Sequence, residues 1–454
     1  MVGKAALEEF RARLRGRVLT PADPGYDEVR RIHNGMFAQR PAVIARCLGT
    51  ADVAESVHFG RSHELELAVR GGGHSVAGKS VCEGGLMLDL SLMKGVHVEP
   101  GPRTARAQGG VTWGEFNRET QLHGLATTGG VVSTTGIAGL TLGGGLGWLM
   151  GKHGLAADNL VGAEVVTATG EVVRASAEEN PELFWGLRGA GGNFGVASWL
   201  EYRLHPVGPV TSGLVAHPVA RAREVLHLFR ERTASAPDEL TLHCGLLHAP
   251  DGSGVPLSAI VACHSGSLGD GEAAARPIKR FGSPVLDTLG PASYEDTNQA
   301  IYDPAFPRGA RNYWKSSFLA DLGDAAIEAL IAQFALCPSP MSALALEHLH
   351  GAAARVGVGD TAFPQRRESF NLMVVSQWTE PADDEKNIAW ARATYAALRP
   401  HMLRESYANY QTEPEAEDGG EQAYGPNYGR LVALKNAFDP ENRFHLNANV
   451  RPTV

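Results

Sequence analysis

Two glycine-rich segments constrain the fold of this chain more than any other feature. The first reads AVRGGGHSVAGKS over residues 68–80, and the second reads LTLGGGLGWL over residues 140–149. Glycine lets a backbone turn sharply, and it also lets backbone N–H groups come close to a phosphate. The chain contains 54 glycines without any period, and they cluster in the first two hundred residues. This part of the chain is therefore expected to consist of short strands joined by loops whose backbone has a structural or ligand-binding role.

These glycines could bind a nucleotide in three ways. Residues 73–80 match the string of a Walker phosphate loop, but a turn and a strand follow Ser80 where that loop needs a helix. Residues 143–151 lack the following βαβ unit with an acidic residue that a Rossmann site needs. In the third arrangement, Gly71–Gly73 and residues 127–147 supply N–H groups to one pyrophosphate from two sides. Tight turns in a β-rich domain, without a ligand, remain an alternative on the residues alone.

Length and charge exclude several classes of protein. At 454 residues, the chain exceeds the usual size of one hydrophobic core, which favours two domains. Its net charge of −9 argues against binding to nucleic acid or an anionic membrane, and no apolar run is long enough to span a membrane. The five cysteines are scattered without a CxxC pair, so neither a disulfide scaffold nor a metal site is predicted. Residues 1–16 read as an amphipathic helix rather than a signal peptide, and a cytoplasmic protein is expected.

The pattern of predicted strands and helices changes at HPVGPV, residues 205–210. Before this break, short strands dominate. After it, longer and evenly spaced strands are separated by helices, which is typical of an antiparallel sheet with helices on one face. The pattern predicts an α+β fold. The predicted parts are a domain at 1–206, a second domain at 207–400 and a C-terminal segment at 401–454.

Four motifs follow one another along the chain: VRGGGHSVAGKSVCEGGLMLDLSLMKGV from residue 69, TGIAGLTLGGGLGWLMGKHGLAADNLVGAEVVTATG from residue 135, NPELFWGLRGAGGNFGV from residue 180 and YGRLVALKNAFDPENRFHLNANVRP from residue 428. Together they resemble FAD-linked oxidases of the berberine-bridge-enzyme-like group, near its bacterial members. This group lies within the vanillyl-alcohol-oxidase superfamily, whose FAD-binding domain is of the PCMH type. The resemblance implies a two-domain PCMH-type FAD-binding fold with an antiparallel-sheet substrate domain covered by helices. It also implies that residues 401–454 return to the FAD domain.

The resemblance places FAD along the glycine segments. In the family, the histidine of RGGGHS bonds to the 8α-methyl group of the flavin, and His74 holds that position. Val132 stands where bicovalent members have a cysteine, and Cys82 lies elsewhere in the motif, so a single 8α-histidyl link through His74 is expected. The family further places residues 191–196 over the adenosine–pyrophosphate end and residues 444–450 near the isoalloxazine. The expected cofactor-binding residues are His74, Arg70, Gly71, Gly72, Gly73, Ser75, Gly78, Gly130, Thr134, Thr135, Gly136, Gly139, Gly143, Gly144, Gly145, Gly147, Asn193, Gly195, Val196, Asn447 and Asn449.

The family also places a tyrosine-bearing segment beside the flavin ring. Here that segment is YANY, with Tyr407 and Tyr410. A phenol next to a flavin can accept a proton if a cationic neighbour lowers its pKa. The usual position of the catalytic glutamate or glutamine falls on Met373, so this chain departs from the plant-type pattern. Tyr407 and Tyr410 are therefore candidate catalytic residues.

A second polar segment, LEHLHG, supplies two further candidates. Strand alternation puts His348 and His350 on one face and Glu347 on the other. The two histidines are expected to face the substrate, where they would orient or deprotonate it. A surface pair, or a metal pair that lacks further ligands, is the alternative.

The resemblance implies an FAD-dependent oxidase that moves a hydride from a CH–OH or CH–NH group of a small molecule to flavin N5 and reduces O₂ to H₂O₂. In the family, a small residue three positions after the second linkage position admits O₂, and Thr135 holds that position. The alternatives are a flavin dehydrogenase with another electron acceptor, a natural-product-tailoring cyclase or oxidase, and a flavin-free binding protein. The expected partners are a small-molecule substrate and O₂, without nucleic acid or membrane, and the expected assembly is a monomer or homodimer.

Overall fold

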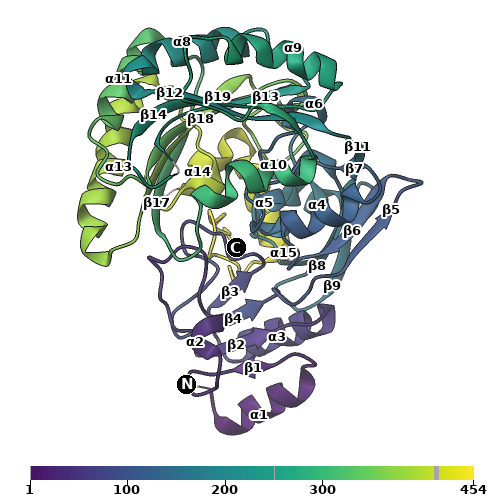
Figure 1. Cartoon of the computed structure of the whole chain (residues 1–454). Coiled ribbons are helices and arrows are strands. Elements are labelled where there is room, and N and C mark those ends of the chain that lie inside the picture. The colour runs from purple at the N-terminus through teal and green to yellow at the C-terminus, as the bar shows by residue number, and fades with distance from the viewer. Residues whose placement is uncertain (1, 250, 414–418) are drawn as a thin grey trace.

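The amino-terminal part of the chain forms two small sheets that share a hydrophobic core (Figure 1). The computed structural model describes residues 2–249, 251–413 and 419–454. The first sheet has the order β1 (Val18–Leu19), β2 (Val43–Arg46), β4 (Leu86–Asp89), β3 (Leu67–Arg70), with β2, β4 and β3 parallel. The second is antiparallel, in the order β5 (Val96–Glu99), β6 (Thr104–Gln108), β10 (Val196–Arg203), β8 (Leu160–Val166), β9 (Val172–Ser176).

Short helices fill the connections between these strands. Helix α4 (Trp113–Gln121) begins with the Thr112–Glu115 capping box, which satisfies backbone N–H groups that have no partner within the helix. The short strands β7 (Leu125–Ala126) and β11 (His205–Pro206) pair with each other. The helices of this part are α1 (Lys4–Arg13), α2 (Tyr26–Val29), α3 (Thr50–Ser62), α4 (Trp113–Gln121), α5 (Ile137–Leu142), α6 (Met150–His153) and α7 (Pro181–Leu187).

A large antiparallel sheet dominates the second part of the chain. Its order is β15 (Leu286–Asp287), β12 (Val210–Pro218), β14 (Pro256–His264), β13 (Leu240–His248), β18 (Ala343–Leu349), β19 (Ser369–Trp378), β17 (Arg311–Leu319), with β16 (Gly290–Ala292) also paired to β12. Figure 1 shows helices on its outer face. Helices α8 (Ala222–Thr233), α9 (Leu268–Lys279), α11 (Asp324–Phe334) and α13 (Asp384–Leu398) bury their apolar residues against this face. The opposite face of the sheet is turned toward the first part of the chain. Helices α10 (Tyr294–Ile301) and α12 (Ala352–Arg355) also lie on this side.

The C-terminal segment returns to the first part of the chain, with α14 (Gly419–Tyr424) and α15 (Tyr428–Phe438) in the middle of the molecule (Figure 1). The Lys435 ammonium group is fully buried, and it lies 2.7 Å from the equally buried Asp439 carboxylate. It also donates to the carbonyl oxygens of Asn193 and Phe444. This buried ion pair therefore joins residues far apart in the sequence.

The α+β class and the two-part arrangement with an antiparallel, helix-covered sheet are confirmed. No helix among the described residues is long and apolar enough to cross a membrane.

Candidate functional site

One cavity of about 980 Å³ lies where the glycine turns, the C-terminal segment and the open face of the large sheet meet. Its walls come from parts of the chain that are distant in sequence. The expected cofactor residues that line it are Gly71, Gly72, Gly73, His74, Ser75, Gly130, Thr135, Gly136, Gly139, Gly143, Gly195, Val196, Asn447 and Asn449. The two glycine segments therefore do come together at one site.

The glycines are needed because residues 71–73 and residues 127–147 touch through their backbones. A Cβ atom on Gly72 would lie 2.3 Å from the backbone nitrogen of Gly136. A Cβ atom on Gly136 would in turn lie 2.4 Å from the nitrogen of Gly72. Gly73 follows with φ +73°, a left-handed conformation that favours glycine. Side chains at these positions would force the two loops apart and open the cavity wall.

His74 extends from the first turn into the cavity. Its Nε2 lies 2.7 Å from the Thr134 hydroxyl and its Nδ1 lies 3.4 Å from the Thr135 hydroxyl. Burial lowers the pKa of His74 well below its ordinary value, with smaller effects from His33 and Arg308. His74 is therefore neutral, and a neutral imidazole is a nucleophile.

Several polar groups in the cavity wall fit a dinucleotide. The Oγ of Ser80 and the Oδ1 atoms of Asn447 and Asn449 are buried without a hydrogen-bond partner within the described structure. Lys79 also lines the cavity, and burial lowers the pKa of its ammonium group. A partly buried cation favours the approach of an anion, and unpartnered oxygens favour the approach of N–H or O–H donors. The residues present thus fit the phosphates and polar groups of FAD.

Other predicted cofactor residues support the cavity without lining it. Arg70 points away from it and forms a buried ion pair with Asp89, at 2.9 Å. Asn193 is fully buried, and its side chain bonds the backbone of Val450 and Ala448. Thr134 is exposed and does not line the cavity, but its hydroxyl lies 2.7 Å from His74 Nε2. Four further glycines were expected to contact the cofactor but do not line the cavity: Gly78, Gly144, Gly145 and Gly147. They instead allow neighbouring groups to pack closely against the backbone.

The sheet face of the cavity carries one carboxylate. Among the described residues that line the cavity, Glu347 on β18 is the only aspartate or glutamate. Its Oε2 accepts a 2.7 Å hydrogen bond from Asn371 Nδ2, and its Oε1 accepts a 3.4 Å hydrogen bond from the Tyr410 hydroxyl. Burial raises the pKa of Glu347 to about 7, although both hydrogen bonds oppose this shift. Such a carboxylate can both accept and release a proton near neutral pH.

The expectation that His348 and His350 face the substrate is wrong, because they lie on the helix-covered side of the sheet. His348 contacts Phe370 and Glu368, outside the cavity, and His350 stacks on His348 with ring centroids 4.4 Å apart. The two histidines do lie on the opposite side of β18 from Glu347, but it is the Glu347 side that faces the cavity. Leu344 and Leu346 indicate the correct face. Both belong to the hydrophobic core under the helices, and His348 lies on the same side of β18.

The two candidate tyrosines differ in position. Tyr410 lines the cavity and packs edge-on against Trp314, with centroids 5.8 Å apart. Tyr407 does not line it, and its buried hydroxyl accepts hydrogen bonds from the Gly145 N–H at 3.1 Å and from Asn409 Nδ2 at 3.0 Å. Burial raises the pKa of Tyr407 to about 12. Tyr407 is thus an anchor for the second glycine segment, whereas Tyr410 can touch a ligand.

Sequence reasoning missed His243 and Tyr302, which lie beside Glu347. His243 on β13 is the direct cross-strand partner of Glu347. Its Nδ1 lies 2.8 Å from the Tyr302 hydroxyl, and both residues line the cavity. Burial lowers the pKa of His243 to about 3, so this imidazole is neutral. The alternation of strand residues 243, 245 and 247 is the one sequence signal that could have placed His243 on this face.

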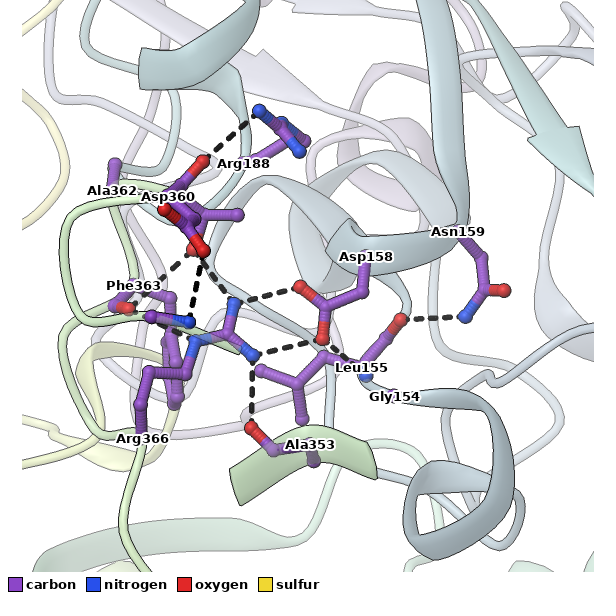
Figure 2. A network of polar contacts seen from close by, with 12 residues as sticks. Gly154, Leu155, Asp158, Asn159, Arg188, Ala353, Asp360, Ala362, Phe363 and Arg366 are labelled. Atoms are coloured by element: carbon purple, nitrogen blue, oxygen red, sulfur yellow. Dashed lines mark hydrogen bonds and ion pairs between the residues drawn. The ribbon is translucent and has the colours of Figure 1, made fainter. Parts of the chain in front are cut away.

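A buried ion pair joins the turn before β8 to the loop that precedes β19 (Figure 2). Both terminal nitrogens of Arg366 contact the Asp158 carboxylate, at 2.8 and 2.7 Å. The same carboxylate accepts from the Leu155 N–H, and Arg366 also donates to the Ala353 carbonyl oxygen. The Arg366 side chain is fully buried. This network holds the turn before β8 against the loop that precedes β19.

Comparison with known proteins gives consistent relatives. Residues 41–176 match the FAD binding domain family and residues 406–451 match the berberine and berberine-like family. The chain is 33% identical to (R)-6-hydroxynicotine oxidase of Paenarthrobacter nicotinovorans over 97% of both chains, and 30% identical to an FAD-linked oxidoreductase of Dictyostelium discoideum over 98% of this chain and 97% of that one. The crystal structure of 6-hydroxy-D-nicotine oxidase from Arthrobacter nicotinovorans superimposes with a TM-score of 0.87 at 32% identity, covering 96% of this chain and 98% of that one. A BBE-like protein of Physcomitrella patens shares the fold, with a TM-score of 0.88 at 22% identity and 99% coverage of both chains.

Proposed function

The chain belongs to the berberine-bridge-enzyme-like FAD-linked oxidoreductases, and from that premise we propose that it is an oxidase of small amines. The proposed reaction removes a hydride from the carbon of a CH–NH group, and O₂ is the electron acceptor. FAD, when bound, supplies the hydride acceptor and passes the electrons to O₂, which gives H₂O₂. The observation that carries the choice of an amine is Glu347, the single carboxylate that the described residues contribute to the cavity wall.

Glu347 suits an amine because of its surroundings. A carboxylate attracts a cation more strongly in a cavity of low dielectric constant than in water. The aromatic faces of Trp314, Tyr302 and Tyr410 line the same cavity and add attraction for a cation. With a pKa of about 7, Glu347 can then take the N–H proton at the working pH. The name of the 33% identical relative, a hydroxynicotine oxidase, also points to a nitrogen-containing substrate.

The register of the sheet indicates the shape of the substrate. Beside the row that contains Glu347 runs a row of small residues in direct cross-strand register: Ala216, Ala259, Gly245, Ala345 and, at its end, Met373. All of them line the cavity. The four small residues present an apolar surface to the cavity and leave space above the sheet. We therefore propose that the substrate carries an apolar body next to its amine.

We also propose that FAD is attached through a single 8α-histidyl link to His74. The support is the neutral, cavity-facing imidazole of His74 and the valine at position 132, which offers no thiol for a second link. Intact-protein mass should exceed the sequence mass by one FAD. In His74→Ala, all of the yellow colour should leave the protein on acid precipitation, and colour retained in the pellet of this variant would contradict the link.

The proposal places the enzyme in the cytoplasm, with a small-molecule substrate and O₂ as its partners. None of the five cysteines forms a disulfide, and four of them, Cys47, Cys82, Cys244 and Cys263, are buried. Unpaired cysteines are usual where thiols are kept reduced.

A peroxide-coupled screen tests the substrate class. Primary and secondary amines with an apolar body, alcohols of matched shape, and mono- and disaccharides should be supplied to the holoenzyme in air. Oxidation of amines with one H₂O₂ per turnover is the expected result. Activity confined to alcohols or sugars would refute the amine. Reduction of the flavin by an amine, followed by reoxidation with a dye but not with O₂, would instead identify a dehydrogenase.

A further inference from the structure

A second histidine lies flat against His74. The rings of His33 and His74 are stacked, with centroids 3.9 Å apart and planes 24° apart. His33 comes from the loop between α2 and β2, and both rings line the cavity. The backbone fixes this approach, because the His33 N–H donates to the Gly73 carbonyl at 3.0 Å and the Gly309 N–H donates to the His33 carbonyl at 2.9 Å. His33 is thus held against His74 by two segments from different parts of the chain.

The remaining contacts of His74 act in the plane of its ring. The Thr134 hydroxyl lies 2.7 Å from Nε2 and the Thr135 hydroxyl lies 3.4 Å from Nδ1. These hydrogen bonds hold the edge of the ring and leave its two faces uncovered. The stacked ring of His33 covers one face and limits movement of the ring toward that side, so the two kinds of contact together fix the imidazole.

Burial keeps both imidazoles neutral. Burial lowers the pKa of His33 to about 4, with a further contribution from Arg308. The same causes lower the pKa of His74, where His33 is an additional neighbour of like charge. The groups that face this pair are thus cationic or neutral, and no acidic residue contributes to either shift. A lone pair on His74 is therefore available at neutral pH.

We infer that His33 is a positioning residue for cofactor attachment: its ring fixes the orientation of the His74 imidazole at which a bond to the 8α-carbon of FAD forms. This inference rests on the proposed covalent link. In the overall step, one nitrogen–carbon bond forms, and one imidazole N–H bond and one 8α C–H bond break. The two electrons released reduce the flavin and then pass to O₂ with the two protons, giving H₂O₂.

Two replacements of similar size separate stacking from simple packing. His33→Phe keeps a flat aromatic face against His74, whereas His33→Leu fills the space without one. The control is His205→Leu, because His205 stacks on His153 at 3.8 Å and 10° but lies outside the cavity. Each protein is produced without flavin and then mixed with FAD in air, and the covalently bound fraction is followed by intact mass and by flavin fluorescence after acid precipitation.

We expect His33→Leu to slow covalent attachment by roughly tenfold or more, because a misplaced nucleophile loses the benefit of orientation. His33→Phe and His205→Leu should attach FAD at nearly the native rate. The dissociation constant for FAD before attachment and the thermal midpoint should be the same in His33→Leu as in His33→Phe, which a merely structural role for His33 would not allow. Native attachment in His33→Leu, or equal slowing in His33→Phe, would overturn the inference. Dissociable FAD in the unaltered protein would instead refute the covalent link itself.

Discussion

Replacing Glu347 with glutamine separates the chemistry of this carboxylate from its packing. Glutamine has nearly the same shape and can still accept the hydrogen bond from Asn371 Nδ2, but it cannot take a proton. Loss of a positioned base costs about a hundredfold to ten-thousandfold in rate. We therefore expect anaerobic reduction of the flavin by an amine to slow at least about a hundredfold in Glu347→Gln. In the unaltered enzyme, kcat/KM should rise with pH through about 7, the pKa of Glu347.

The same variant should change how stability depends on pH. Burial raises the pKa of Glu347 from 4.5 to about 7. The folded chain therefore binds more protons than the unfolded chain between these two values, and stability falls as pH rises through them. The difference corresponds to about 3 kcal/mol, which is present below pH 4.5 and lost above pH 7. Glu347→Gln removes this dependence, so the variant should gain stability relative to the unaltered protein as pH rises.

Denaturant unfolding of both proteins between pH 4.5 and 8.5 measures this effect, and stopped-flow absorbance measures flavin reduction. The matched control is Glu368→Gln, whose carboxylate contacts His348 on the other side of the sheet and is largely exposed. The control should alter neither the reduction rate nor the pH dependence of stability. Parallel stability curves for Glu347→Gln and the unaltered protein would refute the buried, proton-binding carboxylate. Unchanged amine oxidation would refute its role as the base.

Three further substitutions test other parts of the site. Tyr410→Phe should slow flavin reduction by about tenfold or more with little loss of stability, whereas Tyr407→Phe should cost about 1–3 kcal/mol in denaturant unfolding because it leaves a buried donor unpaired. Thr135→Leu should slow reoxidation of the reduced flavin by O₂ in stopped flow, and an unchanged rate would show that O₂ reaches the flavin by another path. Arg366→Met should cost about 3–5 kcal/mol because it removes the ion-pair partner of the largely buried Asp158 carboxylate. Thermal unfolding should show partial recovery when Asp158→Leu is added.

The sequence predicted the parts of the site that local backbone geometry determines. The glycines at 71–73 and 136 were recognisable because close approach of two backbones excludes side chains, whatever the rest of the fold. His74 follows directly from the first of these turns and could be placed with it. Which residues of the turns would line the cavity was harder to predict, because that depends on the partner segment. Arg70 illustrates this: it is adjacent to the turn, yet its charge is used by Asp89 on the neighbouring strand.

The reacting side could not be placed in the same way. Alternation along β18 separates Glu347 from His348, but it does not say which face the helices cover. That choice depends on β-strand partners and on helices that follow in the chain. His33 gives no local signal at all, since its role arises only from contact with a residue that lies further along the sequence. Long-range contacts of this kind are the hardest feature to predict from a single sequence.

The buried pair of Lys435 and Asp439 has a consequence for biosynthesis. It ties the Asn193 loop to a segment that the ribosome makes about 240 residues later, and Asn447 and Asn449 in the cavity wall follow directly after it. At about 5–20 residues per second, the first part of the chain waits roughly 12–50 s for these residues. During that interval the Asn193 loop lacks its partners and the cofactor cavity is open on one side. FAD therefore meets a complete site only late in synthesis, and loading with flavin reports that the whole chain has been made.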